Sequence, residues 1–96
     1  MATVLVDAEN VRRSRWPNLS REELETRTRD WAAQQGHEVL LVWEQPRESA
    51  DDWIARHARE HRPYWLVTSD RELRERAGAD AERVIGGGKF LSELGV

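Results

Sequence analysis

Four short runs of apolar residues divide the chain, and they constrain its fold more than any other feature. Each run is continuous rather than alternating, which is typical of strands buried on both faces of a parallel sheet. The runs are Val4-Leu5-Val6, Val39-Leu40-Leu41-Val42-Trp43, Tyr64-Trp65-Leu66-Val67 and Val84-Ile85. Helical patterns separate them, so the sequence predicts a three-layer α/β/α fold with a small, mainly parallel sheet of about four strands.

Each of the first three predicted helices begins at a serine that can cap the free N–H groups of the first turn. The capping pairs are Ser20 with Glu23, Ser49 with Asp52, and Ser69 with Glu72. Gly36 and Pro63 mark the ends of the first two helices. The predicted inward-facing residues are Leu24, Thr28, Trp31, Ala32 and Gln35 in the first helix, Ala50, Trp53, Ile54, His57, Ala58 and His61 in the second, Leu73 and Ala77 in the third, and Phe90, Leu91 and Leu94 in a fourth, short one. The core is also predicted to include Trp31, Trp43, Trp53 and Trp65.

Length and composition narrow the class of protein. The chain has 96 residues and no cysteine. This length supports one domain, residues 1–96, and the lack of cysteine excludes disulfide scaffolds and cysteine-ligated metal sites. No apolar run approaches the ~20 residues that span a bilayer. The first strand follows Met1-Ala2-Thr3 without a basic leader, so a cytoplasmic domain without membrane contact is expected.

Three acidic residues stand where parallel sheets bind ligands. Asp7 follows the first strand, Asp70 follows the third, and Asp51 lies in the first turn of the helix after the second strand. If these strands are neighbours, their carboxyl ends bring the three carboxylates together. Their mutual repulsion is relieved by a hard divalent cation such as Mg²⁺ or Mn²⁺. Such ions activate water and stabilise charge on phosphate, which is the chemistry of metal-dependent nucleases.

These acidic residues also have a structural explanation. Carboxylates favour the first turn of any helix because they interact with its dipole and its free N–H groups. Asp52 is explained by its capping box, and Asp51 and Asp70 could be dipole partners. No helical pattern follows Asp7 directly, so its position is harder to explain by capping.

The net charge of −3 argues against a protein coated with positive charge for nucleic acid, but it leaves room for a local basic path. Such a path is predicted in the loop after Asp7, where arginines could hold phosphate and a tryptophan could stack on a base. The candidate RNA contacts are Arg12, Arg13, Arg15, Trp16 and, at the same rim, Arg47. The alternative is a solvated loop with Trp16 folded onto the core.

Two further patterns have simple structural readings. His57 and His61 have the spacing of a metal pair on one helix, but no third ligand is evident, and local packing explains them better. Gly86-Gly87-Gly88-Lys89 lacks the spacing of a phosphate-binding P-loop, so it is interpreted as a flexible turn before the last helix.

Three segments carry a resemblance to a known family. They are Val4-Leu5-Val6-Asp7-Ala8-Glu9-Asn10-Val11, Glu48-Ser49-Ala50-Asp51-Asp52-Trp53-Ile54 and Val67-Thr68-Ser69-Asp70. In this order they resemble the YacP-type NYN domains of the PIN-like nuclease superfamily. The tail Ile85-Gly86-Gly87-Gly88-Lys89-Phe90-Leu91 is similar to that family's closing strand and helix, so the resemblance extends over nearly the whole chain.

The resemblance implies a metal-dependent endoribonuclease that hydrolyses RNA phosphodiester bonds. The matching catalytic residues are Asp7, Asp51, Asp70 and Asn10. The three aspartates match the ligands of Mg²⁺ or Mn²⁺, and Asn10 matches a residue that orients the first acid or a water. Further ligand candidates are Glu48 and Asp52, and Glu44 stands where relatives often carry an aspartate.

The chain departs from the family between Trp43 and Ser49, where relatives place a longer segment that includes another strand. The resemblance therefore implies a sheet with one strand fewer, and the exposed edge could join two copies as a homodimer. Ala8 also stands where relatives usually have glycine.

Two other functions stay open at this point. One is a catalytically degenerate module that binds RNA or associates with the ribosome. The other is a receiver-like phospho-acceptor domain, suggested by Asp7, Ser69 and Lys89. The second requires an acceptor aspartate at the end of a central strand, where this chain has Trp43-Glu44.

Overall fold

The computed structural model describes residues 2–96, in which strands and helices alternate as the sequence predicts. The strands are β1 (Thr3–Asp7), β2 (Glu38–Val42), β3 (Tyr64–Val67) and β4 (Arg83–Ile85). The helices are α1 (Ala8–Arg12), α2 (Arg21–Gln35), α3 (Ala50–His57), α4 (Arg71–Ala77) and α5 (Gly87–Glu93), with a 3-10 turn, η1 (Ala58–His61), after α3. None of the helices in this part of the chain has the length and apolar character that crossing a membrane requires.

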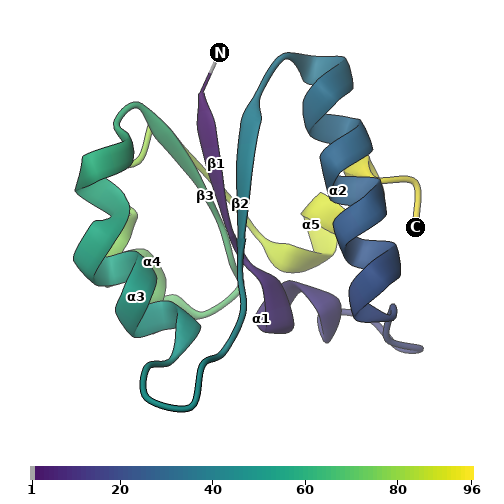
Figure 1. The fold of residues 1–96 in the computed structure, drawn as a ribbon, viewed down its shortest axis with the longest axis horizontal. Coiled ribbons are helices and arrows are strands. Elements are labelled where there is room, and N and C mark those ends of the chain that lie inside the picture. The colour runs from purple at the N-terminus through teal and green to yellow at the C-terminus, as the bar shows by residue number, and fades with distance from the viewer. Residues whose placement is uncertain (1) are drawn as a thin grey trace.

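The four strands form one sheet in which every pairing is parallel, in the order β2-β1-β3-β4. Leu5 in β1 lies between Leu40 in β2 and Leu66 in β3. The chain therefore leaves the central strand β1 toward β2 on one side and returns to β3 on the other (Figure 1). Open parallel sheets bind ligands beyond the carboxyl ends of the strands at such a reversal. The predicted compact α/β domain with a four-stranded parallel sheet is confirmed.

The core has two parts, because successive side chains of β1 point to opposite faces of the sheet. Val4 and Val6 belong to a cluster with Trp31 of α2 and Phe90 of α5. The rings of Trp31 and Phe90 pack edge to face, with their centroids 5.0 Å apart. Leu5 belongs to the other cluster, which holds residues from α3, η1 and α4. Residues from helices thus pack against both sets of β1 side chains, and this packing positions the carboxyl end of β1.

Two of the predicted helix caps are confirmed. The Ser20 hydroxyl accepts the backbone N–H of Glu23 at 3.1 Å, and the Ser49 hydroxyl accepts that of Asp52 at 3.3 Å. Gly36 ends α2 with a φ of 75°, a left-handed conformation that glycine adopts without steric cost.

The start of α4 differs from the prediction by one residue. Asp70, not Ser69, is the capping residue, and its Oδ1 accepts the N–H of Glu72 at 2.9 Å. Ser69 is engaged elsewhere, because its hydroxyl accepts the N–H of Gly87 at 2.8 Å. The capping pattern in the sequence was therefore assigned to the wrong neighbour.

The helix α1 follows Asp7 directly, where none was predicted. Val11 packs into the core, and Glu9 forms ion pairs with Arg12 at 2.8 Å and Arg13 at 2.7 Å. A helix of five residues is too short to show helical periodicity in the sequence. Arg12 therefore belongs to a helix and not to a loop.

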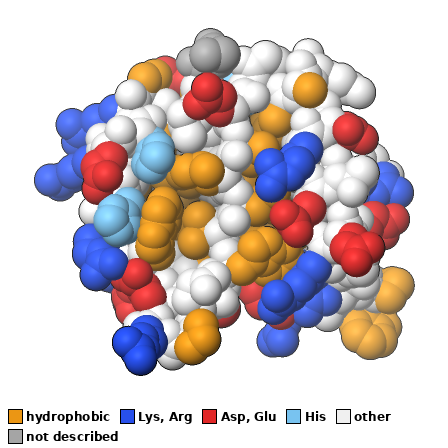
Figure 2. All heavy atoms as spheres, in the orientation of Figure 1, with side chains coloured by type: hydrophobic (Ala, Val, Ile, Leu, Met, Phe, Trp, Pro, Cys, Tyr) orange, Lys and Arg blue, Asp and Glu red, His pale blue; other side chains and the backbone are white. Residues whose placement is uncertain are grey.

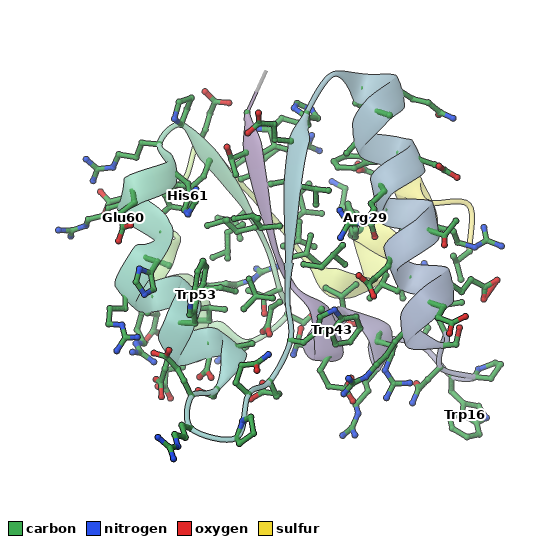
Figure 3. The ribbon with its side chains drawn as sticks, in the orientation of Figure 1. Trp16, Arg29, Trp43, Trp53, Glu60 and His61 are labelled. Carbon is green, nitrogen blue, oxygen red and sulfur yellow. The ribbon has the colours of Figure 1, made fainter. Side chains whose placement is uncertain are left out.

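The predicted tryptophan core is only partly correct. Trp31 is buried, whereas Trp43, Trp53 and Trp65 are partly exposed. The same partial or full exposure applies to four other residues predicted to face inward, Gln35, His57, His61 and Leu94. Trp16 is 88% exposed and points away from the body of the protein, so it does not fold onto the core (Figure 3).

The strand β2 lies at the edge of the sheet, which contradicts its predicted burial on both faces. Its five residues are half-buried or exposed, and Leu40 is 37% exposed. Apolar side chains gather over this strand between α3 and α2 (Figure 2). The exposure of β2 follows from the strand order, because no strand among residues 2–96 lies beyond β2.

Candidate active site

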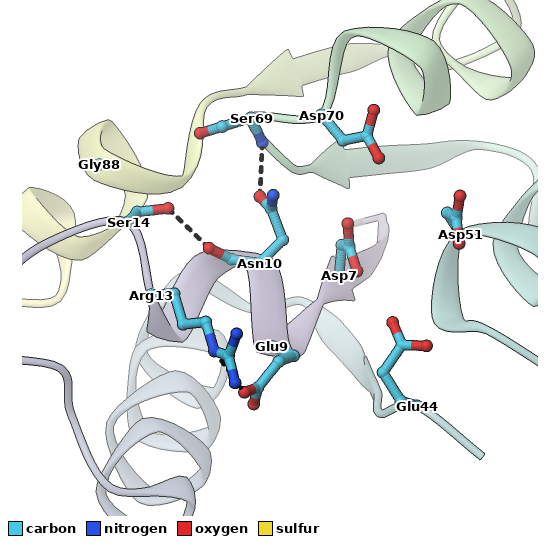
Figure 4. A pocket seen from close by; sticks show the side chains of 10 residues that line it. All are labelled: Asp7, Glu9, Asn10, Arg13, Ser14, Glu44, Asp51, Ser69, Asp70 and Gly88. Atoms are coloured by element: carbon cyan, nitrogen blue, oxygen red, sulfur yellow. Dashed lines mark hydrogen bonds and ion pairs between the residues drawn. The ribbon is translucent and has the colours of Figure 1, made fainter. Parts of the chain in front are cut away.

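An open cleft of about 700 Å³ lies beyond the carboxyl ends of β1 and β3 (Figure 4). It is at the crevice expected from the reversal in strand order. Its lining residues are Asp7, Glu9, Asn10, Arg13, Ser14, Glu44, Asp51, Ser69, Asp70 and Gly88. The lining is rich in carboxylates, and this composition determines which ligands the cleft can accept.

Asp7 is the most deeply placed carboxylate of the cleft, at the end of β1 and only 4% exposed. Burial raises its pKa to about 6, because the charged form loses contact with water. This value already includes a hydrogen bond from Thr68, which lowers the pKa, and the negative charges of Asp51, Glu44 and Asp70, which help to raise it. Asp7 thus lies where a negative charge is costly unless a positive charge joins it.

Three further carboxylates surround Asp7 from separate elements. Asp51 is in the first turn of α3, Asp70 caps α4, and Glu44 follows β2. All three carboxylates point toward the space in front of Asp7 (Figure 4). The structure therefore brings the three predicted aspartates to one cleft and adds Glu44.

Glu9 also lines the cleft, but its charge is already balanced. A hydrogen bond from Arg12 and the charges of Arg12 and Arg13 lower its pKa to about 2. Glu9 therefore stays ionised in its ion pairs, in contrast to the buried Asp7. This difference separates a structural carboxylate from one that favours a cation or a proton.

Thr68 connects the residues at the base of the cleft. Its hydroxyl donates to Asp7 Oδ2 at 2.9 Å and accepts the backbone N–H of Asp70 at 3.0 Å. Asn10 is held in the same network, because its Oδ1 accepts the N–H of Ser69 at 2.8 Å. Sequence reasoning missed Thr68 as a site residue, although a buried threonine directly before two candidate site residues was a usable signal.

A close contact between α5 and the loop after α1 completes the far wall. Gly87 approaches Ser14 so closely that a Cβ on Gly87 would collide with the Ser14 hydroxyl. The same hydroxyl donates to the carbonyl of Asn10 at 2.8 Å. The prediction of a flexible turn before the last helix is therefore wrong: Gly86 is the N-cap of α5, and Gly87 and Gly88 belong to its first turn, where Gly87 allows close packing beside the cleft.

The substitution Thr68→Val is expected to destabilise the protein by about 1–3 kcal/mol, because buried Asp7 loses its hydrogen-bond donor. The pKa of Asp7 should rise further, since Thr68 is the group that lowers it. Urea unfolding and an NMR titration of the Asp7 carboxyl measure the two effects.

Thr28→Val is the matched control, because Thr28 is equally buried and its hydroxyl has no hydrogen-bond partner among the described residues. Its removal should leave the free energy of unfolding unchanged or slightly higher. Equal losses in Thr68→Val and Thr28→Val would contradict a specific role for Thr68.

Glu48 and Asp52, the two further ligand candidates, lie in a neighbouring cleft and do not line the central one. Glu48 forms an ion pair with Arg56 at 2.7 Å, and Asp52 forms one with Arg76 at 2.9 Å. The pKa of Asp52 is lowered, first by its hydrogen bond from Arg76. Both carboxylates therefore have cationic partners from the protein itself.

The arginines of the predicted basic path do not line one continuous surface. Arg12 donates to the Leu19 carbonyl at 2.9 Å, and Arg15 donates to the Gly88 carbonyl at 3.0 Å, so both are engaged in internal contacts. Arg13 lines the cleft, with a side chain that is 66% exposed. Arg47 lines the neighbouring cleft with Glu48.

The fold and this cleft define an α/β domain with an acidic site at the carboxyl edge of a parallel sheet. Comparisons with protein-family models, with curated proteins and with solved structures find no match for this chain. Within residues 2–96, no group of three or more acidic or histidine side chains is already arranged to hold a metal ion. The function is therefore inferred from the chemistry of the cleft.

Proposed function

We propose that this chain is a metal-dependent endoribonuclease domain of the NYN type, with the three-layer PIN-like arrangement of sheet and helices. The observation that carries the proposal is the placement of buried Asp7 among the carboxylates of Asp51, Asp70 and Glu44 in an open cleft. The cleft lies at the crevice where parallel sheets bind their ligands.

The charge of the cleft favours a cation as the first ligand. Four carboxylates around one space repel the phosphates of RNA, so a polyanion can approach only if positive charge is supplied there. An all-oxygen donor set of this kind suits Mg²⁺ or Mn²⁺. Asp7, Asp51 and Asp70 would hold the ion once their side chains rearrange around it, with Glu44 as a further oxygen donor.

A bound Mg²⁺ or Mn²⁺ supplies an activated water and neutralises charge on a phosphodiester. The protein's own residues provide position. Thr68 fixes the orientation of Asp7, and Ser69 fixes the amide of Asn10. Because the Asn10 oxygen is occupied, its NH₂ group is the part that can donate to a water or a phosphate oxygen.

RNA is the proposed substrate because the cleft is open, an arginine lies in its wall, and the loop after α1 carries an exposed tryptophan. Arg13 lies in the cleft wall with a side chain that is 66% exposed, although it also pairs with Glu9, and Trp16 offers a free ring face for stacking on a base. Arg12, Arg15 and Arg47 are assigned lesser roles, because two are engaged internally and the third lines another cleft. A cytoplasmic location fits this substrate.

Cleavage of single-stranded RNA in the presence of Mn²⁺ tests the proposal. The purified chain should cut internal phosphodiester bonds with Mn²⁺, lose this activity with a chelator, and regain it when Mn²⁺ is added back. Gel analysis of an end-labelled RNA, with a circular RNA as a second substrate, distinguishes internal cutting from exonuclease action. RNA binding without cleavage at any Mn²⁺ concentration would reject the enzyme and favour a binding module associated with RNA or the ribosome.

A further inference from the structure

The edge strand β2 presents unpaired backbone groups. Among residues 2–96 it pairs with β1 alone. The N–H of Glu38 points inward, because it donates to the Ala2 carbonyl at 3.1 Å. Since both backbone groups of a strand residue point to the same side and the side alternates along the strand, Val39 and Leu41 direct theirs outward.

Beyond Glu38 at its start, this edge lacks the features by which proteins usually block strand pairing. Natural edge strands carry lysine, proline or a bulge, whereas β2 reads Glu-Val-Leu-Leu-Val without interruption. Two hollows meet at Leu40, one lined also by Val39 and His61, the other by Trp43 and Trp53. Together they form a mostly apolar groove, here called the β2 groove, between α2 and α3 (Figures 2 and 3).

We propose that a second copy of this chain occupies the β2 groove and pairs its own β2 antiparallel to this one, with the two-fold axis at Leu40. In that register each Val39 exchanges both backbone hydrogen bonds with Leu41 of the other copy. The two Leu40 side chains then form the close cross-strand pair and bury their exposed surface. The result is an isologous dimer with one continuous sheet, and it does not depend on the proposed ribonuclease activity.

The charges along α2 favour a second copy over an unrelated strand. Arg21, Glu25 and Arg29 follow one another at four-residue spacing on one face of α2. Arg21 stacks on Trp43 at 4.8 Å, Arg29 lines the groove beside Val39, and Glu25 lies between them, 3.5 Å from Arg29. A two-fold axis at Leu40 reverses this order in the second copy, so each Arg29 faces a Glu25. The row of charges is thus complementary to itself.

Sedimentation equilibrium measures the dimer directly. The unmodified chain should show a monomer–dimer equilibrium between ~1 and ~200 µM. Leu40→Lys should weaken dimerisation at least about tenfold, because it places two like charges opposite each other across the edge. Val96→Lys is the matched control, since Val96 is 38% exposed, compared with 37% for Leu40, and lies outside the groove. A chain that stays monomeric throughout, or a dimer that Leu40→Lys leaves intact, overturns the proposal.

Two further measurements locate the interface. Glu25→Arg and Arg29→Glu should each weaken the dimer about threefold, and the double reversal should restore it, because the charges are again complementary. Amide exchange of Val39 and Leu41 in the unmodified chain should slow as its concentration rises. This readout stands even if Leu40→Lys fails to fold, and concentration-independent exchange at both amides in a dimeric sample would place the contact elsewhere and refute the proposal.

Discussion

Asp7→Asn is expected to lower Mn²⁺-dependent RNA cleavage by at least about a hundredfold, since the stabilisation that a bound metal ion gives to the reacting phosphate amounts to several kcal/mol. Asp7 is the deepest carboxylate of the cleft and the one that Thr68 holds in place. Asparagine keeps the size of the side chain and an oxygen that can accept from Thr68, but it removes the charge that attracts the cation. Initial rates of RNA cleavage at saturating Mn²⁺ measure the effect.

Asp30→Asn is the matched control for the activity measurement. Asp30 is exposed on α2 and does not line the cleft, so the same chemical change there should leave the cleavage rate unaltered. Because both variants are purified in the same way, a contaminating ribonuclease would appear equally in each. Equal cleavage by Asp7→Asn and the unmodified chain would exclude Asp7 from the catalytic site.

The second large effect concerns the stability of the metal-free protein. The pKa of Asp7 is raised from 3.8 to about 6, so the folded state binds the proton more tightly than the unfolded state does. The stability contributed by this group is fully present below pH 3.8 and is lost as the pH rises through about 6. Above that pH the ionised Asp7 lowers the free energy of unfolding by about 2–3 kcal/mol.

Asp7→Asn should therefore stabilise the metal-free protein by about 2–3 kcal/mol above about pH 7, and the gain should vanish below about pH 4. Urea unfolding of both proteins across this pH range measures the difference. The pKa of Glu9 is lowered to about 2 in both proteins, so its titration cancels from the difference between their free energies of unfolding. Added Mn²⁺ should raise the Tm of the unmodified chain and leave that of Asp7→Asn nearly unchanged. A constant difference between the two proteins at all pH values would contradict the assigned titration.

A gain in stability together with a loss of activity would have one physical cause. In the metal-free protein, the repulsion and burial of the carboxylates in the cleft lower the free energy of unfolding. A bound cation would remove this destabilisation. For Asp52 we expect the opposite behaviour, because Arg76 already balances its charge. Measuring stability and activity on the same variant thus distinguishes a functional carboxylate from one that an arginine already neutralises.

Much of the architecture could be predicted from local patterns. The continuous apolar runs predicted the parallel strands, and the serine caps and Gly36 predicted the limits of α2 closely. The post-strand positions of Asp7 and Asp70 predicted their meeting in one cleft, because neighbouring parallel strands end at the same edge. These features depend on residues close together in the chain or on a general property of parallel sheets.

The pairing of side chains from distant segments could not be predicted in the same way. Asp52 meets Arg76 from another helix, and Thr68, which follows β3, reaches Asp7 at the end of the neighbouring strand β1. Such contacts depend on strand order and on the direction of each side chain, which periodicity does not specify. For the same reason the burial of Trp43 and Trp53 was overestimated.

The sequence by itself determined that this chain folds as alternating strands and helices and that several carboxylates follow its strands, because apolar periodicity and helix capping act locally. Only the tertiary structure decided which carboxylates share the cleft, which are neutralised by arginine, and that β2 is left as an open edge. Those outcomes depend on the strand order β2-β1-β3-β4 and on the packing of helices across it, which bring together residues far apart in the chain.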